Sequence, residues 1–218
     1  MKVPKIILKL FRDTFYAISI ISIAVLSVLN TTVVYRYAIY KYELEKYTLL
    51  PKDILMDNYK RVISYVQNPF NKELVLNNIP MSNFGRIHFF EVKRIFIALY
   101  IMSIIFIIVM IFKIITNKNK GLGKKFIENL NNSVSIMALI FVSVSIMAMI
   151  DFDKAFYYFH KMFFRNDYWI FDSITDPIIN ALPEEFFAIE LILIISLLLI
   201  FTLVIKILHL KSKKIIAE

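Results

Sequence analysis

Residues 95–112 read IFIALYIMSIIFIIVMIF, a run that contains no charged side chain. At a rise of about 1.5 Å per residue, a helix of this length crosses most of the bilayer's hydrocarbon core, which is about 30 Å thick. Other apolar runs lie at residues 14–35, 134–150 and 186–205, and the last of them contains one charged residue, Glu190. The sequence therefore predicts an all-α membrane protein with four transmembrane helices, organised as a single membrane domain over residues 1–218.

The composition agrees with this fold class. Hydrophobic residues make up 59% of the 218 residues, which is too apolar for an ordinary soluble domain of this size. The first run follows several basic residues, as a signal peptide does, but its length and its lack of a small-residue cleavage site predict a retained helix. The chain has no cysteine, so disulfides and thiolate metal sites are excluded, and cysteine usage gives no indication of the redox compartment.

The distribution of charge predicts the orientation. The formal net charge is +9, but the basic residues are not gathered in one block of the kind that binds nucleic acid. Segments 1–13, 113–133 and 206–218 carry 13 Lys or Arg against three acids, whereas segments 36–94 and 151–185 carry 13 of each. Because positive charge concentrates in cytoplasmic loops, both termini are expected in the cytoplasm and the two balanced segments outside.

The two outer segments are long enough to form a small extracellular cap. Apolar residues at helical spacing predict an amphipathic helix from about Asp53 to the Asn68–Pro69 pair. Ser82 or Asn83 is a candidate cap for a helix that continues into the second span. A stripe of phenylalanines predicts another helix after residue 151, and Pro183 marks the start of the last helix.

Two of the three histidines, His88 and His160, lie in these outer segments. An ordinary imidazole pKa of about 6.5 allows general acid and base catalysis near neutral pH. Glu91 lies three residues after His88, so on a helix its carboxylate could hydrogen-bond the ring. Asp153 shares a helix face with His160 and could support it similarly. We therefore expect a catalytic histidine pair, although each histidine–carboxylate pair is also compatible with a solvated helix surface.

Other readings of the outer segments remain open. The aromatic residues around His160 are also typical of the interfacial belt of any membrane protein. His88, Glu91, Asp153 and His160 include the right ligand types for zinc, but no close spacing such as H-E-x-x-H supports a metal, and none is expected. Glu190, two turns into the last span, is an ionisable group near membrane depth and hence a functional candidate. No serine lies in a nucleophile motif, which favours proton transfer without a protein nucleophile.

Two stretches carry a resemblance to a known family. Residues 151–187, with FHKMFF, Trp169, Asp176 and LPEEFF, and residues 86–96, RIHFFEVKRIF, resemble the lipoprotein intramolecular transacylases of bacterial membranes. The resemblance implies four helices beneath an extracellular cap in the cell membrane. It implies transfer of the sn-2 acyl chain of a diacylglyceryl-cysteine lipoprotein to the cysteine's own α-amino group, without a cofactor.

The resemblance also implies roles for particular residues. His88 and His160 would be the catalytic pair, with His88 favoured as the base and His160 as the stabilising or protonating group. The supporting carboxylates would be Glu91, Asp153, Asp176 and Glu184, and the substrate-binding aromatic residues would be Phe156, Tyr157, Phe163, Phe164 and Trp169. The partners would be the lipoprotein substrate and membrane lipid. The rival functions are a metal-dependent membrane lipid hydrolase and a non-enzymatic transporter or scaffold.

Overall fold

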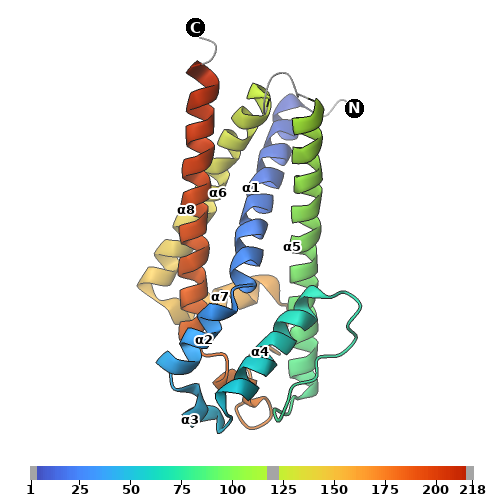
Figure 1. The fold of residues 1–218 in the computed structure, drawn as a ribbon, viewed down its shortest axis with the longest axis vertical. Coiled ribbons are helices and arrows are strands. Elements are labelled where there is room, and N and C mark those ends of the chain that lie inside the picture. The colour runs from blue at the N-terminus through green and yellow to red at the C-terminus, as the bar shows by residue number, and fades with distance from the viewer. Residues whose placement is uncertain (1–3, 117–122, 215–218) are drawn as a thin grey trace. The chain divides into compact units, whose positions relative to one another are not determined.

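Four helices in the computed structural model, which describes residues 4–116 and 123–214, are long and apolar enough to cross a membrane. They are α1 (Lys5–Leu29), α5 (Asn83–Thr116), α6 (Lys124–Ile150) and α8 (Glu184–Lys214) (Figure 1). The shorter elements are α2 (Thr32–Lys41), α3 (Leu44–Thr48), α4 (Lys52–Gln67), α7 (Phe152–Phe163) and the 3₁₀ turn η1 (Pro177–Asn180). The predicted class is confirmed, since the described residues form helices and no strand.

The chain divides into two compact units. The span unit comprises residues 1–25, 99–146 and 194–218, and the cap unit comprises residues 26–98 and 147–193. The cap unit therefore contains the shorter helices together with the adjoining ends of the four long helices. Each unit has its own hydrophobic core.

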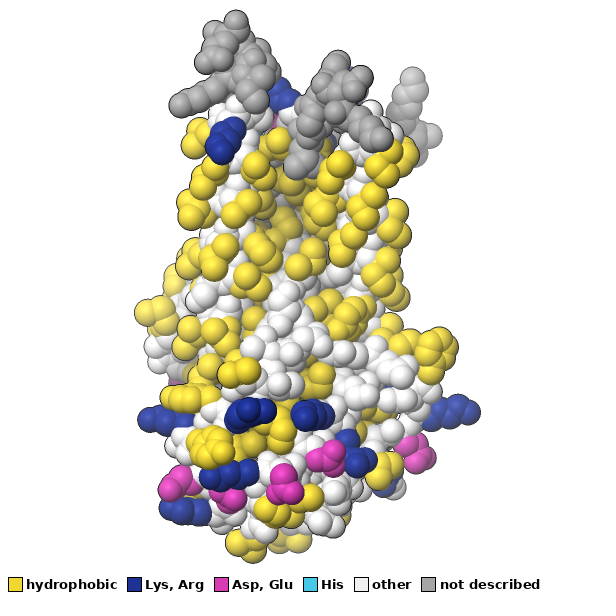
Figure 2. Space-filling view, viewed as in Figure 1, with side chains coloured by type: hydrophobic (Ala, Val, Ile, Leu, Met, Phe, Trp, Pro, Cys, Tyr) yellow, Lys and Arg dark blue, Asp and Glu magenta, His cyan; other side chains and the backbone are white. Residues whose placement is uncertain are grey.

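In the span unit, parts of the four long helices pack around Tyr16. The ring of Tyr16 lies 5.6 Å from both Phe106 and Phe126, with edge-to-face geometry, and Met137 and Leu198 are buried in the same cluster. The outward side chains of this unit are also apolar: Ile104, Ile108, Leu199 and Leu203 are more than half exposed. Figure 2 shows this hydrophobic surface on one face. A helix that is apolar on all sides is suited to lipid rather than water.

The first long helix ends earlier than hydropathy indicates. The predicted run extends to residue 35, but α1 ends at Leu29. There the side chains of Asn30 and Thr31 bond the carbonyl groups of Leu26 and Ser27, and the chain then restarts as α2. Short polar side chains of this kind compete with the helical backbone bonds. The apolar residues that follow belong to the core of the cap unit instead of a span.

The cap unit has a core of stacked aromatic rings. Tyr35 of α2 stacks on Tyr59 of α4 with centroids 4.2 Å apart, and both rings meet the edge of Phe186. The Tyr35 hydroxyl donates to the Ala181 carbonyl at 2.9 Å. Buried Asn58 joins α4 to the loop before α5, since its side chain exchanges two hydrogen bonds with the Asn77 backbone. Helix α4 lies where the sequence predicts it, within one residue at each end.

Candidate active site

The start of α5 is fixed by a buried carboxylate. Ser82 caps the helix, since its hydroxyl accepts from the Gly85 N–H at 3.0 Å. Asp176, only 3% exposed, accepts from the Ser82 N–H at 2.7 Å and from the Thr175 hydroxyl at 3.1 Å. A Cβ atom at residue 85 would lie 2.3 Å from Asp176 Oδ1, so only glycine fits there. Asp176 therefore positions the first turn of α5, and His88 follows one turn later.

Helix α7 carries His160 in its last turn. Asp151 caps the helix by accepting from the Lys154 N–H at 3.0 Å. The Nδ1 atom of His160 lies 2.7 Å from the Phe156 carbonyl oxygen. A carbonyl only accepts, so Nδ1 carries a proton, and in the neutral ring Nε2 has the free lone pair. Burial lowers the pKa of His160, and the hydrogen bond to the Phe156 carbonyl offsets only part of this effect.

The two histidine rings lie together within the cap unit. Their centroids are 5.9 Å apart at an interplanar angle of 38°. Phe164 contacts both imidazoles: its ring centroid is 4.7 Å from that of His88 and 5.6 Å from that of His160. His88 is 7% exposed and His160 is 8% exposed. An apolar enclosure of this kind favours the neutral form of an imidazole, because burial penalises the charged form.

Aromatic side chains enclose the pair. Trp169 stacks on His160 with centroids 4.6 Å apart, and Phe156 lies 4.2 Å from the same ring. Tyr157 meets the edge of Trp169 at 5.6 Å. Phe163, which was predicted with them, instead contacts Phe159 and is half exposed. The structure thus brings three of the five predicted aromatic residues, Phe156, Phe164 and Trp169, into contact with a histidine ring, and Tyr157 and Phe163 each contact a neighbour of His160.

Phe171 is an aromatic neighbour that the sequence reasoning missed. Its ring meets the edge of His88 at 5.5 Å. It lies in a segment without regular secondary structure, so no periodicity placed it near α5. Its position two residues after Trp169 was the only available signal.

The expected hydrogen bond between Glu91 and His88 is not formed. Glu91 Oε1 accepts from the Asn166 side-chain amide at 2.8 Å, and His88 Nδ1 is buried without a hydrogen-bond partner among the described residues. Asn166 also accepts the indole N–H of Trp169 on its carbonyl oxygen, at 3.1 Å. An amide 75 residues away in the sequence therefore takes the place of the imidazole beside Glu91. Asn166 is therefore part of the site.

The expected support of His160 by Asp153 is also replaced. The Asp153 carboxylate lies near the carboxyl group of Glu184 at the start of α8. Seven residues separate Asp153 from His160, a rise of about 10 Å along a helix, and His160 uses the backbone of its own helix instead. Asp153 therefore has Glu184 as its neighbour, and no hydrogen bond links either carboxylate to an imidazole in the described residues.

The carboxylates and histidines do not form a metal centre in the described part of the chain. No group of three or more His, Asp or Glu side chains there is close enough to hold a metal ion. Of the four residues considered for zinc, the two carboxylates have other neighbours: Glu91 accepts a hydrogen bond from Asn166, and Asp153 lies near Glu184. Glu190 has one buried carboxylate oxygen without a partner among the described residues.

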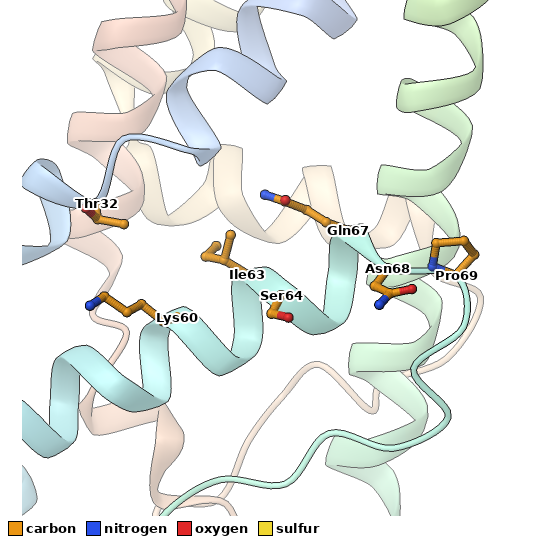
Figure 3. A pocket seen from close by; sticks show the side chains of 7 residues that line it. All are labelled: Thr32, Lys60, Ile63, Ser64, Gln67, Asn68 and Pro69. Atoms are coloured by element: carbon orange, nitrogen blue, oxygen red, sulfur yellow. The ribbon is translucent and has the colours of Figure 1, made fainter.

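A separate hollow in the cap unit lacks the chemistry of the histidine pair. It is an open pocket of about 490 Å³ beside α4, lined by Thr32, Lys60, Ile63, Ser64, Gln67, Asn68 and Pro69 (Figure 3). Lys60 is its single charged lining residue, and the pocket contains none of the predicted site residues. The histidine pair is therefore the stronger candidate for catalysis.

Residues 11–187 match the family described as lipoprotein intramolecular transacylase Lit. The chain belongs to this family. Three solved structures of the Bacillus cereus transacylase Lit are similar to it throughout. One shares 29% sequence identity with a TM-score of 0.83 and covers 95% of each chain.

The other two are variants of the same Bacillus cereus protein in which a histidine is replaced. The arginine variant is 30% identical with a TM-score of 0.76, and it covers 97% of this chain and 94% of its own. The alanine variant is 30% identical with a TM-score of 0.75, and it covers 95% and 93%. None of the curated proteins matches the sequence. As a transacylase of the Lit family, the chain is a multi-pass membrane protein and an acyltransferase.

Proposed function

We propose that this transacylase moves the acyl chain at the sn-2 position of a diacylglyceryl-cysteine lipoprotein to the α-amino group of that cysteine. The product is a lyso-form lipoprotein. The observation that carries this proposal is the pair of buried imidazoles 5.9 Å apart, enclosed by aromatic rings that are suited to lipid. The substrate brings its own nucleophile, so the enzyme must supply only positioning and proton transfer.

The hydrogen bonds support a division of roles between the two histidines. His160 donates from Nδ1 to Phe156, so its Nε2 lone pair can accept a proton. His88 Nδ1 is buried without a partner, and an unpaired lone pair is tolerated there better than an unpaired N–H. His88 would then carry its proton on Nε2 and act as a donor. These tautomers favour His160 as the base, the reverse of the order that the resemblance implies.

The reaction balances with these two groups. The amine nitrogen attacks the ester carbonyl carbon while Nε2 of His160 takes a proton from the nitrogen. The carbonyl π electrons move to oxygen, and the Nε2–H of His88 stabilises that oxyanion. When the tetrahedral intermediate collapses, the bond between the acyl carbon and the sn-2 oxygen breaks. That oxygen receives the proton from His160, so an amide and a hydroxyl replace an amine and an ester.

The membrane topology follows from the charge distribution. We place both termini in the cytoplasm and the cap unit on the outer face, since the excess of basic residues lies in segments 1–13, 113–133 and 206–218 and positive charge concentrates on the cytoplasmic side. The exposed Tyr158 and Phe159 of α7 and Ile170 after it are suited to the headgroup boundary, where lipid ester groups lie. Figure 2 shows the Lys, Arg, Asp and Glu side chains on one face of the cap unit.

The test is mass spectrometry of a defined diacyl lipopeptide incubated with the purified protein. The proposal predicts an unchanged mass with new fragments in which one acyl group sits on the α-nitrogen. Loss of one acyl chain would instead show a lipid hydrolase. No change in the lipopeptide with protein shown to be folded would contradict both enzymatic readings.

A further inference from the structure

The carboxylate of Glu91 is held by one oxygen and leaves the other unsatisfied. Oε1 accepts from Asn166 at 2.8 Å, whereas Oε2 is buried and makes no hydrogen bond with the described residues. A buried carboxylate oxygen without a donor is unfavourable, and such groups in native proteins are often ligand sites. The oxygen that is fixed by Asn166 therefore orients a second oxygen for a donor from outside the chain.

This second oxygen belongs to the surroundings of the histidine pair. Glu91 follows His88 by one turn of α5, a spacing that puts their Cβ atoms about 5–6 Å apart on one helix face. Its partner Asn166 accepts the indole N–H of Trp169, and Trp169 stacks on His160. Glu91 is thus joined to both catalytic rings, through its own helix and through Asn166.

The two lysine ammonium groups that are nearest in sequence to Glu91 and His160 make contacts with other residues. Lys93, two residues after Glu91, donates to the Asn71 carbonyl and lies over the Tyr65 ring. Lys161, next to His160, pairs with Asp167 at 2.5 Å. The unsatisfied oxygen is therefore complementary to a cation that arrives with the substrate.

We infer that Oε2 of Glu91 binds the α-ammonium group of the lipoprotein's N-terminal cysteine and holds it beside the two imidazoles. The inference rests on the proposed function and names the part of the substrate that Glu91 recognises. An α-amino group has a pKa of about 7.7–8.0, so near neutral pH the group is mainly a cation with three donors. Because Oε2 is buried, the side chains around it must part as the substrate enters.

The bound ammonium then becomes the nucleophile. It passes one proton through Nε2 of His160 to water, and Glu91 keeps the resulting neutral amine in place by accepting a hydrogen bond. The amine attacks as described above, and its second proton moves through His160 to the sn-2 oxygen. Glu91 accepts hydrogen bonds throughout and is a binding group, not the base.

The test uses non-reactive ligands and the full chain in lipid nanodiscs. The probes are two lipopeptides with an ether in place of the sn-2 ester, one with a free α-amine and one with an α-N-acetyl group. Their affinities are measured at pH 7 for the wild type and for Glu91→Gln, which keeps an oxygen for Asn166. Glu185→Gln is the matched control, since Glu185 is an exposed carboxylate in the first turn of α8.

The wild type should bind the amine form at least about tenfold more tightly than the acetyl form, as expected of a charge-assisted hydrogen bond. Glu91→Gln should abolish that preference and leave the acetyl form within about twofold of its wild-type affinity, with Glu185→Gln unchanged. Equal weakening of both forms would show a purely structural role and overturn the inference. Loss of the preference in Glu190→Gln instead of Glu91→Gln would also overturn it.

Failure here is distinguishable from failure of the proposed function. If the wild type moves the acyl chain of an ester substrate but Glu91→Gln keeps the amine preference, only the assignment of Glu91 fails. If the preference depends on Glu91 but no acyl chain moves, the proposed transfer fails and the amine site stands.

Discussion

Trp169 stacks on the imidazole of His160, with ring centroids 4.6 Å apart at an angle of 25°, and its indole N–H is bound by the Asn166 carbonyl. The indole therefore fixes the orientation of His160 from one side while the Phe156 carbonyl fixes it through Nδ1. One restraint comes from α7, the helix that carries His160, and the other comes from the segment that follows it, so the ring is held from two sides.

Replacing Trp169 with leucine should slow acyl transfer on the order of tenfold to a hundredfold, because misplacement of a reacting group by about 1 Å has effects of this size. Trp169→Phe should recover part of the rate, since it retains a stacking ring and loses only the bond to Asn166. Tyr168→Leu is the matched control: it removes a ring that stacks on Phe84 at 4.5 Å. Initial rates by mass spectrometry decide, and equal rates for Trp169→Leu and Tyr168→Leu would contradict the positioning role.

His160 should become protonated only at a lower pH than an ordinary histidine. Burial lowers its pKa, so the ring should titrate below the ordinary value of about 6.5. The unfolded chain then binds more protons in the window between the two pKa values. Stability is therefore complete above about pH 6.5 and decreases as the pH falls toward the folded pKa. NMR titration of the imidazole, identified by its loss in His160→Gln, measures this directly, and a midpoint at or above 6.5 would refute it.

Gly85→Ala should destabilise the protein and reduce its activity. The new Cβ would lie 2.3 Å from Asp176 Oδ1, so either the carboxylate or the first turn of α5 must move. Overpacking of this kind costs about 1–3 kcal/mol. Asn83→Ala, an exposed change in the same turn, controls for altered helix propensity. Thermal melting in detergent reports the change, and a wild-type melting temperature for Gly85→Ala would show that Asp176 does not fix this helix.

Asn58→Ala should lower the stability of the protein more than the neighbouring substitution Asp57→Ala does. Asn58 is 1% exposed and exchanges hydrogen bonds of 2.8 and 2.6 Å with the Asn77 backbone, which would be left unpaired. A buried group left without a partner costs about 1–3 kcal/mol. Asp57→Ala removes an exposed ion pair with Arg61, worth about 0–1 kcal/mol. The two melting temperatures are compared, and similar losses in both variants would run against this account.

The sequence predicted the parts of the fold that depend on local pattern. Hydropathy located the four long helices, and Ser82 or Asn83 was expected as a cap of the helix that carries His88, a role that Ser82 takes. The end of α1 was missed, because a hydropathy window does not register the competition of Asn30 and Thr31 for backbone carbonyls. The apolar residues after it gave the same signal whether they faced lipid or a protein core.

Within the candidate site, the residue types were predictable but their partners were not. His88 and His160 were expected on one side of the membrane, and the structure brings them within 5.9 Å. Glu91 was expected to bond His88 because sequence spacing reveals only neighbours on the same helix. Its actual partner, Asn166, comes from a loop 75 residues away, and only tertiary structure shows that contact.

The central claim is that His160 carries one proton from the amine nitrogen to the glycerol oxygen while His88 stabilises the oxyanion. The most direct measurement is the single-turnover rate of acyl transfer in His88→Gln, His160→Gln and the double variant, with folding checked by melting temperature. General acid–base groups contribute about 10²–10⁴-fold, so each single variant should lose at least about a hundredfold, and the double variant should lose little more. A near wild-type rate in either single variant would contradict the account.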